Sequence, residues 1–122
     1  MSSAFGEART VPASKEAKEL LRKLVNMGLI TEQRDGWRLG AAMGLAAGET
    51  HTKGQRGTFQ NINSLDPEEL FAAVMLGRYP KDEPEDRLRI LVDHAEWGIR
   101  ELWRQQEKGV LNFAALASKR QT

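Results

Sequence analysis

The stretch "GWRLGAAMGLAAG", residues 36–48, carries a glycine at every fourth position: Gly36, Gly40, Gly44 and Gly48. Each glycine inside a helix costs about 1 kcal/mol relative to alanine, so four of them at one spacing need a structural reason. The residues between them are mostly compatible with a helix, and four residues turn a helix by about 400°, so the glycines share one slowly drifting stripe. The stretch therefore predicts a helix with one face that lacks side chains.

A helix face without side chains lets another segment or molecule approach the backbone closely. The three candidates are another helix of the same chain, a second copy of the protein, and a ligand. We therefore take the four glycines as a candidate helix-packing or oligomer interface, and we expect a homo-oligomer.

Upstream of this stretch, the pattern predicts a short strand and a first helix. "ARTV" before Pro12 is typical of a short edge strand. Ser14 is the expected N-cap of a helix over residues 15–27, whose apolar residues form one stripe opposite charged residues, and Gly28 ends it. Thr31 is the expected cap of the glycine-striped helix.

Downstream, residues 48–63 are polar and rich in glycine, which predicts a loop. Asp66 and Pro67 then suit the N-cap and first position of a third helix, and Leu65 is expected to pack on Leu70 as a hydrophobic staple. This helix should end by Pro80. Its expected buried residues are Leu70, Phe71, Val74 and Met75.

A fourth helix follows the acidic turn "YPKDEPED", residues 79–86, and ends at Lys108 and Gly109. Its expected apolar face consists of Leu88, Leu91, Val92, Ala95, Ile99 and Leu102. The sequence thus predicts a mainly α protein with a compact four-helix domain. We expect an N-terminal arm or short strand over residues 1–13, one helical domain over 14–118 with a short docked turn up to Leu116, and a frayed tail over 119–122.

The composition narrows the class of protein. The chain has 122 residues and no cysteine, which excludes disulfides and thiolate metal sites and favours an intracellular protein. The longest uncharged apolar run, residues 39–48, is about half of what a membrane-spanning helix needs, and the first residues lack the apolar core of a signal peptide. We therefore expect a cytoplasmic protein without a membrane partner.

Positive charge is concentrated in the first half of the chain. Residues 1–60 hold nine lysines and arginines against six acidic residues, whereas residues 61–122 hold nine against eleven. The order strand, helix, helix also fits the ribbon-helix-helix plan, in which a ribbon from two chains enters the major groove of DNA and a helix N-terminus, here at Thr31, lies against phosphate. The candidate nucleic-acid-binding residues are Arg9 and Thr10 on the ribbon, Arg34 and Arg38 near the helix start, and Lys53 and Arg56 in the loop.

The sequence offers little for catalysis. Neither a phosphate-binding glycine loop nor a GxSxG nucleophile elbow is present. The two histidines are His51 in the polar loop and His94 between Ile90 and Trp97, and a metal site would need further ligands from elsewhere. We expect His94 to be packed or hydrogen-bonded, and we expect no enzyme activity, metal or cofactor. A hydrolase that pairs His94 with a neighbouring carboxylate is a distant third class of function.

Four segments carry a family resemblance: "SKEAKELLRKL", "RDGWRLGAAMGLAAG", "SLDPEELFAAVMLGRYP" and "LVDHAEWGIRELWR". With these in place, residues 14–104 resemble small accessory proteins encoded with DNA phosphorothioation (Dnd-type) modification and restriction systems. The first half is also similar to the helical DNA-binding subunit of these systems. The resemblance implies a non-enzymatic partner in genome and phage defence, and it implies no catalytic residue.

Two functions remain open from the sequence. The first is an accessory protein that binds DNA or a DNA-processing complex. The alternative is a protein-protein adaptor that uses the glycine-striped helix as its partner surface and does not contact DNA. Salt separates the two, because phosphate contacts make affinity fall steeply with salt whereas an apolar interface changes little.

Overall fold

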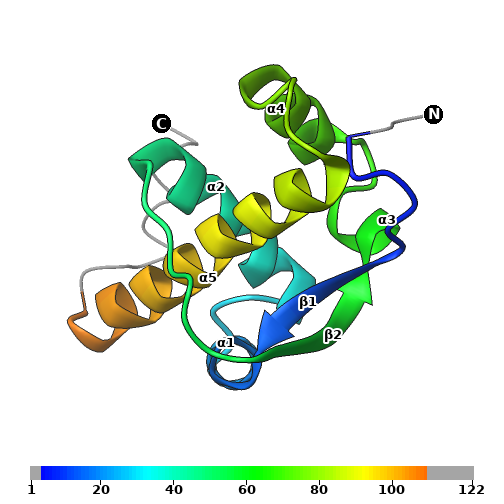
Figure 1. The fold of residues 1–122 in the computed structure, drawn as a ribbon. Helices are drawn as coiled ribbons and strands as arrows, with labels where there is room; N and C mark the ends of the chain where they lie inside the picture. The colour runs from blue at the N-terminus through cyan, green and yellow to red at the C-terminus, as the bar shows by residue number, and fades with distance from the viewer. Residues whose placement is uncertain (1–3, 110–122) are drawn as a thin grey trace, which may run out of the picture.

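The computed structural model of the protein describes residues 4–109 and is mainly helical, as the sequence predicts. In chain order its elements are β1 (Thr10–Ser14), α1 (Lys15–Asn26), α2 (Gln33–Ala47), β2 (Arg56–Asn61), α3 (Ile62–Leu65), α4 (Leu70–Arg78) and α5 (Pro84–Glu107). The four expected helices correspond to α1, α2, α4 and α5, while α3 is an additional single turn. Figure 1 shows α5 running through the middle of the molecule.

No helix between residues 4 and 109 combines the length and apolar character that a membrane span requires. The expected docked turn up to Leu116 and the expected frayed tail over residues 119–122 lie outside the described residues.

The glycines of α2 pack against the backbone of α5. A Cβ atom at Gly44 would lie 2.1 Å from the carbonyl oxygen of His94, and one at Gly40 would lie 2.9 Å from the backbone nitrogen of Ile99. The α5 helix contributes a glycine of its own, since a Cβ atom at Gly98 would lie 1.7 Å from the carbonyl oxygen of Gly40. Real Cβ atoms do not approach other atoms this closely, so only glycine fits here. The partner of the stripe is thus a helix of the same chain.

The other two glycines of the stripe have different surroundings. A Cβ atom at Gly36 would meet the side chains of Leu21 and Ile30, each at 2.6 Å, so Gly36 packs against α1 and the turn after it. Gly48 has a left-handed φ of 69° and ends α2 as its C-cap, with no atom near its missing Cβ. Its assignment to the packing stripe is wrong, because the helix ends at Ala47 and a left-handed C-cap favours glycine for its backbone conformation.

The strand β1 pairs antiparallel with β2 of the same chain, with Val11 opposite Gln60 and Ser14 opposite Arg56. The prediction that residues 48–63 form a loop is therefore wrong for Arg56–Asn61. The ribbon-helix-helix plan needs correction for the same reason. In that plan a second chain supplies the antiparallel partner of the first strand, and here β2 supplies it within one chain.

The caps of the first two helices show one confirmed and one wrong prediction. The Oγ of Ser14 accepts a hydrogen bond from the backbone N–H of Ala17 at 3.0 Å, as an N-cap should. The cap of α2 is Glu32 rather than Thr31. Glu32 and Asp35 each accept a hydrogen bond from the other's backbone N–H, and this reciprocal capping box satisfies two N–H groups at once.

The start of α4 lies later than the sequence predicts. The helix begins at Leu70 rather than at Pro67, directly after Glu69, whose φ of 56° is left-handed. Asp66 nevertheless caps it, because its two carboxylate oxygens accept the backbone N–H groups of Phe71 and Ala72 at 3.0 and 2.9 Å. The prediction of a hydrophobic staple between Leu65 and Leu70 is wrong. Leu65 is fully buried, whereas the late start of the helix leaves Leu70 exposed.

A buried carboxylate joins β1 and α1 to α5. Glu96 is 1 % exposed and accepts hydrogen bonds from the backbone N–H of Ser14 at 2.9 Å, the Oγ of Ser14 at 2.6 Å and the guanidinium of Arg100 at 2.9 Å. Burial raises the pKa of Glu96, but the hydrogen bonds from Ser14 and Arg100 outweigh it, and the pKa lies below its ordinary value. Glu96 is therefore charged and fully engaged within the fold.

His94 is buried, and its Nδ1 lies 2.8 Å from the backbone carbonyl oxygen of Glu49, just after the end of α2. This is the packed and hydrogen-bonded histidine that the sequence predicts. Since the next residue, Asp93, also accepts the backbone N–H of His51 through its carbonyl at 3.0 Å, this part of α5 holds the chain that leaves α2.

Replacing His94 with glutamine is expected to lower the free energy of unfolding by about 1 kcal/mol, because the amide does not reproduce the ring's packing and its hydrogen bond to Glu49 together. Thermal unfolding of the purified variant measures this. The matched control is His51→Gln, where the side chain makes no hydrogen bond within residues 4–109 and the change should be near zero. Equal stability of both variants would contradict a structural role for His94.

Candidate functional site

The outer face of α2 and the adjoining face of α4 form a groove with a volume of about 650 Å³. This size lies within the range of ordinary ligand-binding pockets. We call it the α2–α4 groove. Its lining residues on α2 are Asp35, Arg38, Leu39, Ala42, Leu45 and Ala46, and those on α4 are Leu70, Phe71, Val74 and Arg78.

The two faces of α2 have different neighbours. The inner face carries Gly40 and Gly44, which lie against the α5 backbone. The outer face carries Leu39, Ala42 and Ala46, which are apolar and point into the groove. Because the inner face is already covered, the outer face is the part of α2 that is left for another molecule.

Aromatic packing and a capping carboxylate hold α4 beside α2. The rings of Trp37 and Phe71 meet edge to face, with 5.9 Å between their centroids. At the other end of the groove, the guanidinium of Arg78 donates to the backbone carbonyl of Leu45 at 3.4 Å. Together with the cap by Asp66, these contacts place the start and the end of α4 against α2 and fix the groove between them.

The groove exposes large apolar side chains. Leu70 is 57 % exposed and Val74 is 39 % exposed, and both line the groove next to Phe71. The sequence predicts both residues to be buried, and this prediction is wrong. The core takes the opposite side of the helix, through Ala72 and Met75. Adjoining exposed apolar side chains in a groove are typical of a surface that binds another protein.

The amino-acid composition of α4 itself indicates this surface. The segment "LFAAVMLGR" of α4 holds large apolar residues on more than one side: Leu70, Phe71, Val74, Met75 and Leu76. A nine-residue helix on the surface of a domain buries only one side. The surplus of apolar residues therefore indicates an exposed apolar face.

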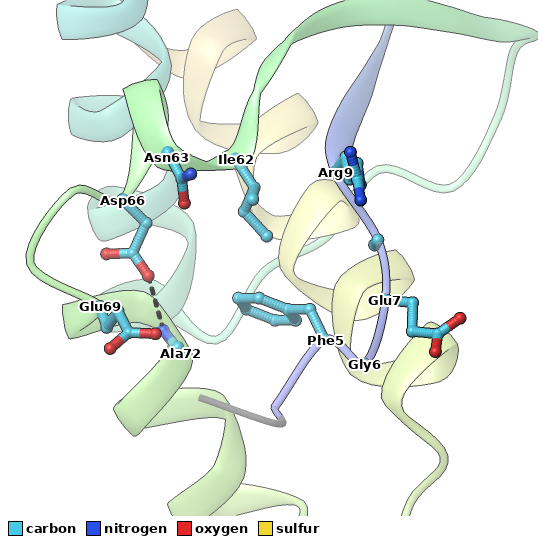
Figure 2. A pocket seen from close by; sticks show the side chains of 10 residues that line it. Phe5, Gly6, Glu7, Arg9, Ile62, Asn63, Asp66, Glu69 and Ala72 are labelled. Carbon is cyan, nitrogen blue, oxygen red and sulfur yellow. Dashed lines mark hydrogen bonds between the residues drawn. The ribbon is translucent and has the colours of Figure 1, made fainter. Parts of the chain in front are cut away.

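A second cavity, of about 540 Å³, lies between the N-terminal arm, α3 and the start of α4, and Figure 2 shows its side chains. Phe5 and Ile62 extend into it, whereas Glu7 is turned away from Asp66 and Glu69. Both oxygens of Asp66 are used to cap α4. The carboxylates that line this cavity therefore do not converge on one point, and Asp66 serves as the cap of α4.

The predicted nucleic-acid-binding residues lie in three parts of the fold: the β1–β2 ribbon, α2 and the segment before β2. Arg9 and Thr10 are exposed at the start of β1, and Arg9 lines the second cavity. Arg34 forms an ion pair with Glu32, and Arg38 lines the α2–α4 groove. Since β1 pairs with β2 from Thr10 to Ser14, Arg9 and Arg56 lie at opposite ends of the ribbon, about 15 Å apart along the strand.

Arg56 and Lys53 lie near the start of α1. The guanidinium of Arg56 donates to Asp93 at 2.5 Å and to the backbone carbonyl of His51 at 2.6 Å, and its side chain is 14 % exposed. Arg56 is thus paired with Asp93 within the fold, and its role in nucleic-acid binding stays a prediction. Lys53 is exposed beside a small cavity that it shares with Arg100.

The positive charges near Lys53 are partly balanced by carboxylates from other parts of the chain. Arg100 in that cavity pairs with Glu96 and with Glu16, at 2.9 and 3.2 Å. Burial and the nearby charge of Arg100 lower the pKa of His51, which favours its neutral form. Of the three cations that line this cavity, Arg100 is paired with carboxylates, whereas Lys15 and Lys53 are exposed and form no ion pair within residues 4–109.

Within residues 4–109, no three histidine, cysteine, aspartate or glutamate side chains gather where they could hold a metal ion. Asp93 and Glu96, which the third class of function would pair with His94, accept hydrogen bonds from Arg56 and from Ser14, respectively. Among residues 4–109, the α2–α4 groove joins a cavity to exposed large apolar side chains, and we take it as the candidate functional site. No protein-family model, curated protein or solved structure matches this chain.

Proposed function

We propose that this protein is a non-enzymatic accessory protein that binds a helical segment of another protein in the α2–α4 groove. The observation that carries the proposal is the exposure of Leu70 and Val74 beside the apolar outer face of α2. A groove between two helices with an apolar floor is the usual seat of an amphipathic helix. The resemblance to accessory proteins of DNA phosphorothioation systems makes a subunit of a DNA modification or restriction complex the expected partner.

The sequence-based adaptor hypothesis used the glycine stripe as the partner surface, whereas here the partner binds the other face of α2. The glycine stripe lies against α5, so the partner meets the opposite face of the same helix, through Leu39, Ala42 and Ala46. The glycines contribute indirectly, because the close approach of α5 holds α2 in place.

Binding to the groove can be measured with a probe peptide. The probe is a synthetic sixteen-residue amphipathic helix with one leucine stripe and a fluorescent label, titrated with the full chain and followed by anisotropy. We expect the double variant Leu70→Ser, Val74→Ser to weaken binding about tenfold, because both side chains lose apolar contact with the peptide. Its stability should change little, since both side chains are exposed.

The matched control is Leu76→Ser. Leu76 belongs to the same helix and is 39 % exposed, like Val74, but it does not line the groove. It should bind the probe as the parent does. Equal loss in both variants, or no loss in either, would overturn the proposal.

Two other results would favour different functions. A dimer in analytical ultracentrifugation that Leu70→Ser, Val74→Ser dissociates would make the groove a contact between copies of this chain. Micromolar binding of duplex DNA that weakens in an Arg9→Ala, Lys53→Ala variant would favour direct contact with DNA. Each phosphate contact adds about 0.9 to the slope of log affinity against log salt, so a steep slope identifies that outcome.

A further inference from the structure

Two arginines lie at the rim of the α2–α4 groove, Arg38 from α2 and Arg78 from α4. Neither has a carboxylate within ion-pair distance among residues 4–109. Asp35 is the one acidic residue that lines the groove in that range, and it accepts the backbone N–H of Glu32 at 3.1 Å. The groove therefore combines an apolar floor with a net positive rim.

The two arginines are at opposite ends of the groove. Trp37 of α2 contacts Phe71 near the start of α4, and Leu45 near the end of α2 contacts Arg78 at the end of α4, so the two helices run in the same direction. Arg78 thus lies at the level of Leu45, seven residues beyond Arg38. At 1.5 Å per residue, seven residues correspond to about 10.5 Å along the helix axis.

We infer that the groove binds an amphipathic helix of a partner protein that carries two carboxylates seven residues apart, with leucine-like residues between them. Residues seven apart in a helix share one face and lie about 10.5 Å apart, which equals the axial offset along α2 between Arg38 and Leu45, whose carbonyl oxygen Arg78 contacts. The apolar residues at the third and fourth positions between them face Val74, and Leu70 lies at the Arg38 end of the groove, next to Phe71. This inference rests on the proposed function and names the chemistry of its partner.

An extended peptide fits this arrangement less well. A strand covers 10.5 Å in about three residues, and residues three apart point to opposite faces of a strand. Both carboxylates of such a peptide could not face the groove. A phosphate backbone would pair with the arginines but would leave Leu70 and Val74 without apolar contact.

Two probe peptides of identical composition test the inference. Both carry the same leucine stripe. In the first, two glutamates seven residues apart flank the stripe on its own face, and in the second the same two glutamates lie on the opposite face. We expect the first peptide to bind the full chain about fivefold more tightly at low salt, because two partly exposed ion pairs contribute modestly. This preference should disappear in 0.5 M salt.

The double variant Arg38→Gln, Arg78→Gln is expected to bind both peptides equally, while its melting temperature stays near that of the parent. The matched control is Arg9→Gln, which removes an exposed arginine outside the groove and should keep the preference. A preference that survives in the double variant would overturn the inference.

Failure of the inference and failure of the proposed function give different results. If both peptides bind equally to the parent and Leu70→Ser, Val74→Ser weakens both, then the groove binds helices but does not select carboxylates. If neither peptide binds the parent at 100 µM, groove docking itself is wrong.

Discussion

Replacing Gly98 with alanine is expected to lower the free energy of unfolding by about 3 kcal/mol or more. The new Cβ atom would lie 1.7 Å from the carbonyl oxygen of Gly40, and a backbone atom cannot turn aside as a side chain can. Insertion of one methyl group into a packed contact already costs about 1 to 3 kcal/mol. Denaturant unfolding followed by circular dichroism measures the loss, and Gly44→Ala, whose Cβ would lie 2.1 Å from the carbonyl oxygen of His94, should behave in the same way.

The control for this experiment is Gly77→Ala. Gly77 lies in α4 and has no atom within 4 Å of its missing Cβ, so the added methyl meets open space. Alanine favours a helix over glycine, and this variant should be as stable as the parent or up to about 1 kcal/mol more stable. A rise in melting temperature for Gly98→Ala as well would mean that α2 and α5 do not cross at these glycines.

Replacing Glu96 with alanine is expected to destabilise the fold by about 3 kcal/mol. The change removes the acceptor for both the backbone N–H and the hydroxyl of Ser14, and it removes the buried partner of Arg100. Loss of one member of a buried ion pair typically costs 3 to 5 kcal/mol, because the other charge remains without compensation. Arg100 is partly exposed and keeps Glu16, which places the expectation at the lower end.

Two measurements check this prediction. The control Glu16→Ala removes the exposed partner of the same arginine, and its free energy of unfolding should stay within about 0.5 kcal/mol of the parent. The second measurement is the dependence of stability on pH for Glu96→Gln. The pKa of Glu96 is lowered by folding, so its contribution is present above its ordinary value of 4.5 and is lost as the pH falls through the lower folded pKa.

The parent should therefore lose stability more steeply than Glu96→Gln as the pH falls below 4.5. Identical acid unfolding curves for the two proteins would show that the carboxylate carries no net stabilisation of the fold.

Local signals in the sequence predicted most of the helices and several of the residues at which they begin or end. Ser14 caps α1 through its own side chain, and Gly109 follows α5 with a left-handed backbone, because both effects depend on residues within one turn. The strand β2 was not predicted, because the residues "RGTFQN" show no clear alternation of apolar and polar side chains. Its conformation comes from pairing with β1, which is more than forty residues away.

The candidate site was harder to predict than the fold. The basic residues of the first half suggested one surface for DNA, but ion pairs formed across the chain, such as Arg56 with Asp93, neutralise some of them, and the ribbon separates others. Leu70 and Val74 were predicted to be buried, and their exposure depends on where α4 begins. That start is set by Asp66 and Glu69 outside the helix.

The sequence by itself determined that the backbone around Gly40 and Gly44 admits a close neighbour, because four-residue spacing and the absence of a side chain are local properties. Which neighbour comes close, and which face of the helix stays open, only the tertiary structure decided. Gly98 provides the matching gap on α5, and this match joins residues that are 58 positions apart in the chain. A periodic pattern reports how one helix presents its faces, whereas the choice of partner depends on the shapes of two surfaces together.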